Sequence, residues 1–439
     1  MTTFDAILPH ITSILRHHVT ALPCIGQLFI NRDLNGRVRL IVDDKVQGNA
    51  LAMHTLTTIA HAVENGLGPH AYPAQSAILY EADLELACAG ATVFPLEGFE
   101  TVQVIDRLAT ESHWTSIAPL SQGAPRIVFF SIKGGVGRST ALAACAWVLA
   151  QEGKKVLVLD LDLESPGLSS ALLPDERQPV YGITDWLVED LVDNGEAVFD
   201  DLIATSPLTH DGEIYIVPAC GHDPGDYVAK LGRVWMPKVG SDGIPKPWSQ
   251  RLSHLINALE DRLEPDVMLI DSRAGIDEVA SACITDLGAE LVLLFAIDGD
   301  QTWSGYQMLL RHWQRTGQAM TIRDRLQMVG AMIPEDRHRD YFGGLRERAW
   351  NVFAESLYDE IPAGELSVDR FNFDEMDQSA PHYPWPVLWT RGFFALRSLH
   401  SRFESIDEHK LQQTFGELIT GLKTVTDQER TTTPSTTPA

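Results

Sequence analysis

The chain has 439 residues, with 34 lysine and arginine residues against 60 aspartate and glutamate residues, a formal net charge of −26. This balance excludes a broad basic surface for nonspecific binding to duplex DNA, because phosphate contacts require clustered cations. Hydrophobic residues make up 44% of the chain, enough for a substantial core in two or three domains.

Cysteine usage and the N-terminus both bear on the cellular compartment. Five cysteines are scattered without a C-x-x-C pair, which argues against a zinc clamp or a disulfide framework: Cys24, Cys88, Cys145, Cys220 and Cys283. The N-terminus lacks the pattern of a signal peptide, and no run approaches about 18 apolar residues. We therefore expect a cytoplasmic protein without a membrane segment.

Residues 1–120 predict a small α+β domain. We expect helices over 1–20 and 49–65, strands at 27–30 and 37–42 joined by Asn35-Gly36, and shorter strands at 77–81, 92–95 and 101–105. His54 and His61 lie two helical turns apart, too far to chelate one ion, so we interpret them as surface or core residues. We expect this domain to bind a protein partner or to regulate the rest of the chain, from which residues 121–125 separate it as a linker.

The most informative stretch follows this linker. Ile127–Phe130 predicts a buried strand, Gly134, Gly135 and Gly137 allow a tight loop, and Ser139-Thr140 opens a helix that runs to Glu152. Converging backbone amides and the positive end of a helix both favour negative charge. The strand, loop and helix therefore predict a phosphate-binding site.

Two further apolar strands end in carboxylates. Val156–Asp162 ends in Asp160 and Asp162, and the strand within 265–276 ends in Asp271. A single aspartate at a strand end is ordinary, but three in this order behind a glycine loop indicate a nucleotide site.

These segments resemble the deviant Walker A ATPases of the ParA/MinD type. Lys133-Gly-Gly-Val-Gly-Arg-Ser-Thr140 is similar to their K-G-G-x-G-K-[ST]-[ST] loop, with Lys133 at the signature lysine position. The Asp160/Asp162 strand resembles the D-x-D switch segment, and the strand ending in Asp271 resembles the Walker B segment. The resemblance covers roughly residues 125–425 and implies a doubly wound, mostly parallel α/β P-loop domain, here 121–427. Residues 428–439 are expected to be a low-complexity, disordered tail.

The resemblance implies ATP and Mg²⁺ as cofactors. Backbone amides would cradle the phosphates, from Gly134, Gly135, Val136, Gly137, Arg138, Ser139 and Thr140. Ser139 and Asp271 would hold Mg²⁺ with support from Asp160, and Asp162 would orient the attacking water. Lys133 would reach the ATP of the partner in a homodimer, so that ATP closes the dimer and hydrolysis opens it.

Three departures from the family pattern stand out. Arg138 replaces the usual P-loop lysine and is a candidate catalytic residue with Asp162 and Lys133. If its planar fork does not fit between the β and γ oxygens, turnover is slowed, while ATP binding through the amides persists. Arg273 stands where the Walker B segment has proline, and it either senses the γ-phosphate or pairs with Asp277 or Glu278. The adenine-contacting asparagine of relatives is missing, and we place base contact near Pro384–Leu388, with Pro386 as the candidate residue.

Several alternatives remain open from the sequence. An ATP-binding scaffold with negligible hydrolysis fits the same motifs. A small-molecule ligase of this fold would cover its second substrate with the glycine- and proline-rich insertion at 224–247. We expect this insertion to be a long loop. Its aromatic residues Tyr227, Trp235 and Trp248 either form a partner surface or pin that loop to the core. ParA-like DNA positioning would use the basic segment from Arg311 to Arg325, although the acidic charge favours a solvated helix end. MinD-like membrane attachment through the helix at 411–422 is disfavoured by its mixed polar face.

Overall fold

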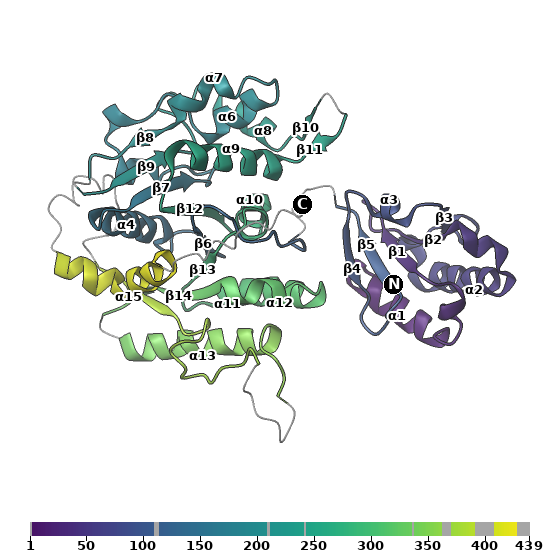
Figure 1. Cartoon of the computed structure of the whole chain (residues 1–439). Coiled ribbons are helices and arrows are strands. Elements are labelled where there is room, and N and C mark those ends of the chain that lie inside the picture. The colour runs from purple at the N-terminus through teal and green to yellow at the C-terminus, as the bar shows by residue number, and fades with distance from the viewer. Residues whose placement is uncertain are drawn as a thin grey trace, which may run out of the picture. The chain divides into compact units, whose positions relative to one another are not determined.

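The computed structural model describes residues 2–108, 114–208, 211–240, 243–335, 338–361, 370–390 and 408–427, and it divides into two units (Figure 1). One unit comprises Met1–Ser116 with His312–Gln318, and the other comprises Ile117–Arg311 with Ala319–Ala439. The division falls at 116/117, against the predicted domain boundary at 120/121. The predicted disordered tail, residues 428–439, lies outside the described residues.

The N-terminal unit is built on a five-stranded mixed sheet of order β3-β2-β1-β5-β4. Its strands are β1 (Leu28–Arg32), β2 (Val38–Asp43), β3 (Ile78–Glu81), β4 (Thr92–Pro95) and β5 (Val102–Asp106). Its helices are α1 (Ile7–His17), α2 (Ala50–Leu67) and α3 (Leu84–Cys88). The predicted α+β class and the order of its elements along the chain agree with this arrangement.

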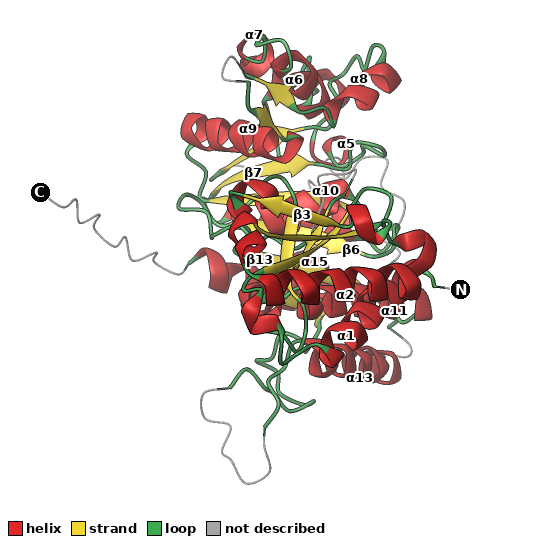
Figure 2. Cartoon of the chain, turned by 90° about the vertical axis from the view of Figure 1, so that its right-hand side faces the viewer, coloured by secondary structure: helices red, strands yellow, loops and turns green. Residues whose placement is uncertain are grey.

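Alternation along the strands sets the two faces of this sheet. Residues such as Ile30, Leu40 and Val104 are buried beneath α1 and α2, which lie side by side on one face (Figure 2). The opposite face carries a smaller apolar cluster around Phe29 and Ile41. The Asn35-Gly36 hairpin joins β1 to β2 as predicted, with φ of +76° at Gly36, a conformation that glycine adopts without a steric penalty.

The second unit contains an eight-stranded sheet of order β15-β14-β13-β6-β12-β7-β9-β8, parallel except for the edge strand β8. Its strands are β6 (Arg126–Ser131), β7 (Lys155–Asp160), β8 (Ala204–Thr205), β9 (Glu213–Val217), β12 (Val267–Ala274), β13 (Leu291–Ala296), β14 (Leu326–Ile333) and β15 (Trp385–Leu388). Its helices are α4 (Arg138–Gln151), α5 (Ser169–Leu172), α6 (Ile183–Asp190), α7 (Glu196–Phe199), α8 (Tyr227–Val234), α9 (Trp248–Leu263), α10 (Glu278–Ser281), α11 (Asp300–Arg315), α12 (Ala319–Ile322), α13 (His338–Ser356) and α15 (Glu408–Thr426).

Helices cover both faces of this sheet, as the doubly wound prediction requires. On one face, α4 and α15 pack together over residues that include Phe129, Val158 and Leu269. On the other face, Tyr306 of α11 meets Phe130, with 6.2 Å between the ring centroids. The central strand β6 lies between β12 and β13, and the chain proceeds from it to β7 on one side and later to β13 on the other. Ligands bind at such a reversal of strand order, beyond the carboxyl ends of the strands.

The insertion at 224–247 differs from the long loop that its composition predicts. It contains the helix α8 and a two-stranded ribbon of β10 (Lys238–Val239) and β11 (Pro245–Lys246). Ion pairs of Lys238 and Arg251 with Asp190, at 2.8 and 2.7 Å, tie this region to α6. The local turn signals are correct, but tertiary contacts order the segments between them.

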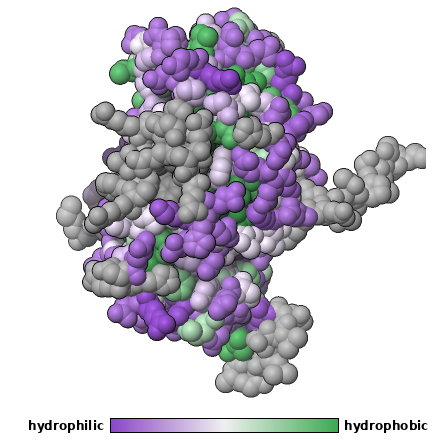
Figure 3. All heavy atoms as spheres, turned by 90° about the vertical axis from the view of Figure 1, so that its left-hand side faces the viewer, coloured by the Kyte–Doolittle hydropathy of each residue, from purple (hydrophilic) through white to green (hydrophobic). Residues whose placement is uncertain are grey.

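Within the described residues, no helix is both long enough and apolar enough to cross a bilayer. Where Figure 3 shows described residues, hydrophilic side chains dominate and apolar ones form small separate patches.

Candidate nucleotide-binding site

The glycine loop connects the carboxyl end of β6 to the first turn of α4. Gly135 and Gly137 have φ of +74° and +82°, in the left-handed region that side-chain-bearing residues rarely adopt. These conformations turn the chain sharply into α4, which begins at Arg138. The strand, loop and helix predicted from the sequence are therefore present, with the free amides of the helix start at the loop.

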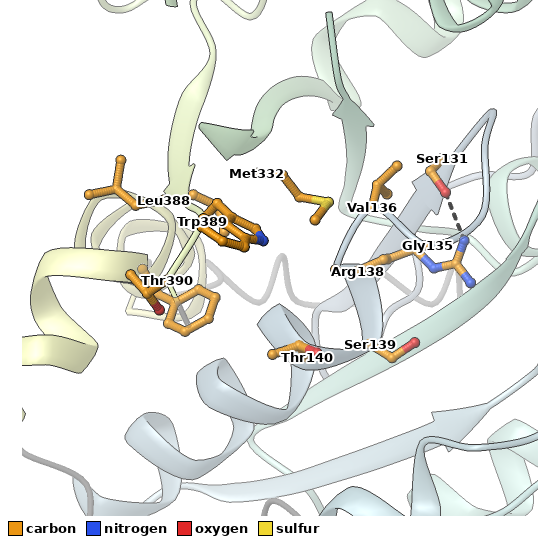
Figure 4. A pocket seen from close by; sticks show the side chains of 13 residues that line it. Ser131, Gly135, Val136, Arg138, Ser139, Thr140, Met332, Leu388, Trp389 and Thr390 are labelled. Carbon is orange, nitrogen blue, oxygen red and sulfur yellow. Dashed lines mark hydrogen bonds between the residues drawn. The ribbon is translucent and has the colours of Figure 1, made fainter. Parts of the chain in front are cut away.

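A cavity of about 320 Å³ opens at this loop (Figure 4). On one side it is lined by the loop and the start of α4, from Gly135 to Thr140, together with Ser131. On the other side it is lined by Met332, Val387–Thr390 and Phe415. Of the predicted phosphate-binding residues, Gly135, Val136, Gly137, Arg138, Ser139 and Thr140 line this cavity.

The apolar side of the cavity was placed only approximately by the sequence. Pro386 pairs with Gly330 in the sheet and is not among the lining residues, whereas the next four residues are. Met332, at the end of β14, has φ of +52°, a strained conformation for a residue with a side chain. Met332 and Phe415 could not be predicted from the sequence, because neither belongs to a polar or glycine-rich pattern. Trp389, an aromatic residue directly after a strand, is the sequence feature that could have indicated this wall of the cavity.

Arg138 lines the cavity, and its guanidinium contacts side chains from β6, from β12 and from the segment just after β7. Its Nε donates to Asp271 Oδ1 at 2.6 Å, its Nη1 donates to Ser131 Oγ at 2.9 Å, and its Nη2 lies 3.8 Å from Asp162 Oδ2. The side chains of Arg138 and Asp271 are 7% and 2% exposed. Burial by itself would lower the pKa of Arg138, but the charge and hydrogen bond of Asp271, together with the charges of Asp162 and Asp160, raise it overall, so the guanidinium stays protonated.

Asp160 organises the loop that follows β7. Its carboxylate accepts hydrogen bonds from the backbone N–H groups of Asp162, Gly167 and Leu168, at 3.2, 3.2 and 3.1 Å. Burial, reinforced by the negative charge of Asp271, raises the pKa of Asp160 to about 7. The D-x-D segment is thus fixed by its first aspartate, which leaves the second free to act.

Asp162 is the half-buried carboxylate beside Arg138. Its Oδ1 is buried and has no hydrogen-bond partner among the described residues. Burial raises the pKa of Asp162, and the nearby Arg138 opposes that effect. An unpaired buried acceptor costs free energy unless something donates to it, and a water molecule is the simplest donor.

Lys133 and Arg273 lie at the rim of the site. Lys133 is exposed, and its carbonyl accepts from Ser131 Oγ at 3.0 Å, which leaves the ammonium group at the surface. Arg273 pairs with Glu164 at 2.6 Å and with Asp277 at 3.3 Å. Of the two roles that the sequence left open for Arg273, these contacts favour the ion pair, and they add Glu164 as a partner that the sequence did not indicate.

The predicted magnesium ligands fit an ion that takes most of its ligands from phosphate and water. Among the described residues, no group of three or more His, Cys, Asp or Glu side chains is arranged to hold a metal ion by itself. Both oxygens of Asp160 accept backbone hydrogen bonds, whereas Asp271 has one oxygen not engaged by Arg138. Mg²⁺ is ordinarily bound through one or two protein groups plus phosphates, which Ser139 and Asp271 could supply.

The basic segment proposed for DNA contact is engaged within the protein. Arg311 pairs with Glu355 at 3.0 Å, Arg323 pairs with Asp359 at 2.6 Å, and Arg325 donates to the carbonyl of Ala118 at 2.9 Å. The charges of Arg311 and Arg323 are thus paired within the protein, which weakens the case for DNA contact through this segment.

The aromatic residues of the insertion serve its packing. Trp248 is buried, and Trp235 meets it edge-on with 4.9 Å between the ring centroids. Tyr227 donates from its hydroxyl to the carbonyl of Leu163 at 2.6 Å, just after the D-x-D segment. These residues therefore hold the insertion against the site, which supports the second of the two interpretations made from the sequence.

A glycine loop between the central strand and a helix of a doubly wound sheet, with carboxylates at the neighbouring strand ends, defines a P-loop nucleotide-binding protein. Residues 127–410 match the CobQ/CobB/MinD/ParA nucleotide binding domain, and the chain belongs to that family. This agrees with the ParA/MinD resemblance of its motifs.

Individual relatives match shorter parts of the chain. The septum site-determining protein MinD of Buchnera aphidicola subsp. Baizongia pistaciae is 30% identical over 158 residues, which cover 36% of this chain and 48% of that protein. MinD of Escherichia coli (strain K12) is 37% identical over 106 residues, covering 24% of this chain and 36% of that protein. The chain thus spans less than half the length of these curated relatives. A solved MinD from Pyrococcus horikoshii OT3, complexed with Mg-ADP, aligns over 69% of this chain and 98% of its own, with 20% identity and a TM-score of 0.43.

Proposed function

We propose that this chain is an ATP-binding and ATP-hydrolysing switch that dimerises with ATP and controls a protein partner. The observation that carries the proposal is the convergence of Ser131, Asp162 and Asp271, from three strand ends, on the guanidinium of Arg138 beside the glycine loop. Phosphoryl transfer requires charge neutralisation and an aligned water, and little else from the protein.

Each group has a role in this proposal. Amides from Gly134 to Thr140 bind the phosphates, and the cavity wall of Met332 and Val387–Thr390 receives the base. Ser139 and Asp271 hold Mg²⁺, which, when bound, neutralises charge on the phosphates. Asp162 accepts a hydrogen bond from the attacking water at its unpaired Oδ1.

Lys133 supports the dimeric part of the proposal. Its ammonium group makes no hydrogen bond or ion pair within the part of the chain that the structure describes. In the family that the loop resembles, a lysine at this position reaches the nucleotide of the second subunit. The partner that reads the switch is proposed to bind the N-terminal unit.

Asp162→Ala tests hydrolysis directly. We expect phosphate release to fall by about 10²-fold or more, because general-base positioning contributes that much, while ATP binding and ATP-dependent dimerisation persist. The matched control is Asp175→Ala, the same change at an exposed carboxylate further along this segment. Equal phosphate release from both variants would contradict the assignment of Asp162. Sedimentation with and without ATP reports dimerisation.

A second function, an ATP-retaining scaffold, is favoured by the Arg138–Asp271 pair. Because both side chains are buried, moving Arg138 onto phosphate would break that pair. Arg138→Lys distinguishes the two functions, since a compact ammonium fits between phosphates better than a planar fork. If the protein is a switch whose hydrolysis is slowed by Arg138, the Arg138→Lys variant turns over ATP about tenfold or more faster than wild type. A scaffold shows the same background phosphate release in wild type, Arg138→Lys and Asp162→Ala.

A further inference from the structure

A second polar cavity, of about 270 Å³, lies in the N-terminal unit on the sheet face opposite α1 and α2. It is lined by Asn31, Asp33, Arg39, Ile41, Tyr72, Leu79, Glu81, Ala87 and Arg107. Strand alternation places these charged side chains here, because Ile30, Leu40 and Val104 point to the helical face. Nothing in the P-loop chemistry uses this cavity.

The strand register brings the two arginines to the same asparagine. Arg39 lies directly opposite Asn31 in the antiparallel pairing of β1 with β2. Arg107, one residue past β5, donates from Nε to Asn31 Oδ1 at 3.0 Å and from Nη2 to the carbonyl of Ala87 at 2.7 Å. Arg107 is thus bonded to Asn31, and Arg39 lies on the strand opposite the same residue, so two cations line one cavity, an arrangement in which like charges repel.

Neither positive charge is neutralised by the described residues. Arg39 stacks on the Tyr72 ring, with 3.7 Å from Cζ to the centroid, and its buried Nε has no hydrogen-bond partner among them. Both acceptors of Arg107 are uncharged. A buried donor without a partner costs free energy, so something in addition to these groups is expected to meet the cations.

The nearby carboxylates either bond to other groups or lie too far from Arg39 and Arg107 to form an ion pair with them. Asp33 accepts from the Tyr72 hydroxyl at 2.7 Å and from the backbone of its own turn, and Asp106 is paired with Arg32 on the other face. Glu81 lines the cavity but is not within ion-pair distance of either arginine. Among the residues that the structure describes, no carboxylate pairs with Arg39 or Arg107, so an anionic ligand fits between them.

We propose that the N-terminal unit binds a small oxyanion, a carboxylate or phosphate group, between Arg39 and Arg107. A guanidinium fork matches both groups with paired hydrogen bonds. The cavity volume lies just below the usual range of about 300–1,000 Å³ for drug-sized ligands, so the ligand is a small molecule or a single anionic group.

The test is calorimetry of the full chain with inorganic phosphate and, separately, with succinate, in the presence of saturating Mg-ADP to fill the P-loop. At least one anion binds saturably, and which of them binds identifies the group. Arg39→Gln and Arg107→Gln each weaken that binding by about tenfold or more, the loss expected for a charge-assisted hydrogen bond. Glu81→Gln, which removes a negative charge from the cavity, leaves binding unchanged or tightens it.

Two outcomes overturn the proposal: neither anion binds, or binding survives both arginine substitutions. Because saturating Mg-ADP occupies the P-loop, the anion titration does not report on the nucleotide site, and its failure is distinguishable from failure of the proposed switch. Thermal unfolding of each variant shows that it is folded before binding is measured.

Discussion

The two polar sites use arginines in opposite ways. In the P-loop unit, Arg138 is almost fully buried and bound to Asp271, with Asp162 nearby. In the N-terminal unit, Arg39 is stacked on Tyr72 with an unpaired Nε, and Arg107 is bonded only to neutral oxygens. The first site has its charges balanced by the protein, whereas the second leaves positive charge for a ligand.

This difference has consequences for stability and for binding. Removing one member of a balanced buried pair exposes the other to an apolar environment, which is strongly unfavourable. Removing a cation that has no counter-charge relieves repulsion and costs only packing. Substitutions at the two sites test this difference between a paired and an unpaired arginine.

The largest effect is expected for Asp271→Ala, which leaves Arg138 buried without its main partner. Breaking such a pair costs about 3–5 kcal/mol of unfolding free energy. The control is Asp427→Ala, which removes the exposed partner of Lys154 and should cost no more than about 1 kcal/mol. Urea unfolding of both variants measures the difference. Equal costs would mean that Arg138 relaxes into solvent and is not held by Asp271.

A change of similar size in the free energy of unfolding is expected with pH, because of the titration of Asp160. Its pKa is raised by burial from 3.8 to about 7 in the folded protein, so the native state binds a proton that the unfolded state has lost between these values. The stabilisation is complete below about pH 4 and is lost as pH rises to about 7, by at most about 4 kcal/mol.

Asp160→Asn removes this titration. Unfolding free energy measured from pH 4 to 7 should therefore decline less steeply in the variant than in wild type. A parallel decline in both proteins would show that Asp160 ionises normally.

A smaller effect, on ATP affinity, is expected for the residues of the cavity wall that we propose to contact the base. Trp389→Ala should weaken ATP binding by about tenfold, in keeping with about 1–3 kcal/mol for stacking of a base on an aromatic ring. Pro386→Ala should leave affinity unchanged, because Pro386 does not line the cavity. Calorimetric titration with ATP checks both. The reverse order of effects would restore Pro386 as the base contact.

The smallest effect is expected for Arg39→Gln in the absence of ligand. We expect the unfolding free energy to change by less than about 1 kcal/mol, because no ion pair is broken. Chemical denaturation beside Asp271→Ala gives the comparison directly. A loss as large as that of Asp271→Ala would mean that Arg39 has a structural partner, and the contrast between the two sites would fail.

The sequence predicted the strand, glycine loop and helix of the P-loop because the residues that form them are local. Gly135, Gly137 and Ser139 lie within a few residues of each other, Asp160 ends β7, and Asp271 follows the apolar run of β12, three residues before that strand ends. Parallel strands bring such ends to one edge of a sheet, so order along the chain is enough to place them. The partners of Arg138 were not predicted, because side-chain direction at a buried loop depends on packing.

The oxyanion cavity was not predicted at all. Asn31 lies on β1, Arg39 on β2 and Arg107 one residue past β5, and only the pairing of these strands makes them neighbours. Each looks like an ordinary polar residue in an alternating strand. The ordered helix and ribbon inside 224–247 were missed for a related reason, since Arg251 and Lys238 order that segment through Asp190 of a distant helix.

The most direct test of the account is calorimetry of Mg-ATP binding to wild type, Gly137→Val and Gly153→Val. Both glycines have φ above +80°, with nothing within 4 Å of an added Cβ, so the backbone strain is matched, but only Gly137 belongs to the phosphate loop. We predict saturable binding to wild type and to Gly153→Val, and none to Gly137→Val. Absence of heat from wild type, or equal binding by all three proteins, would contradict a nucleotide site at this loop.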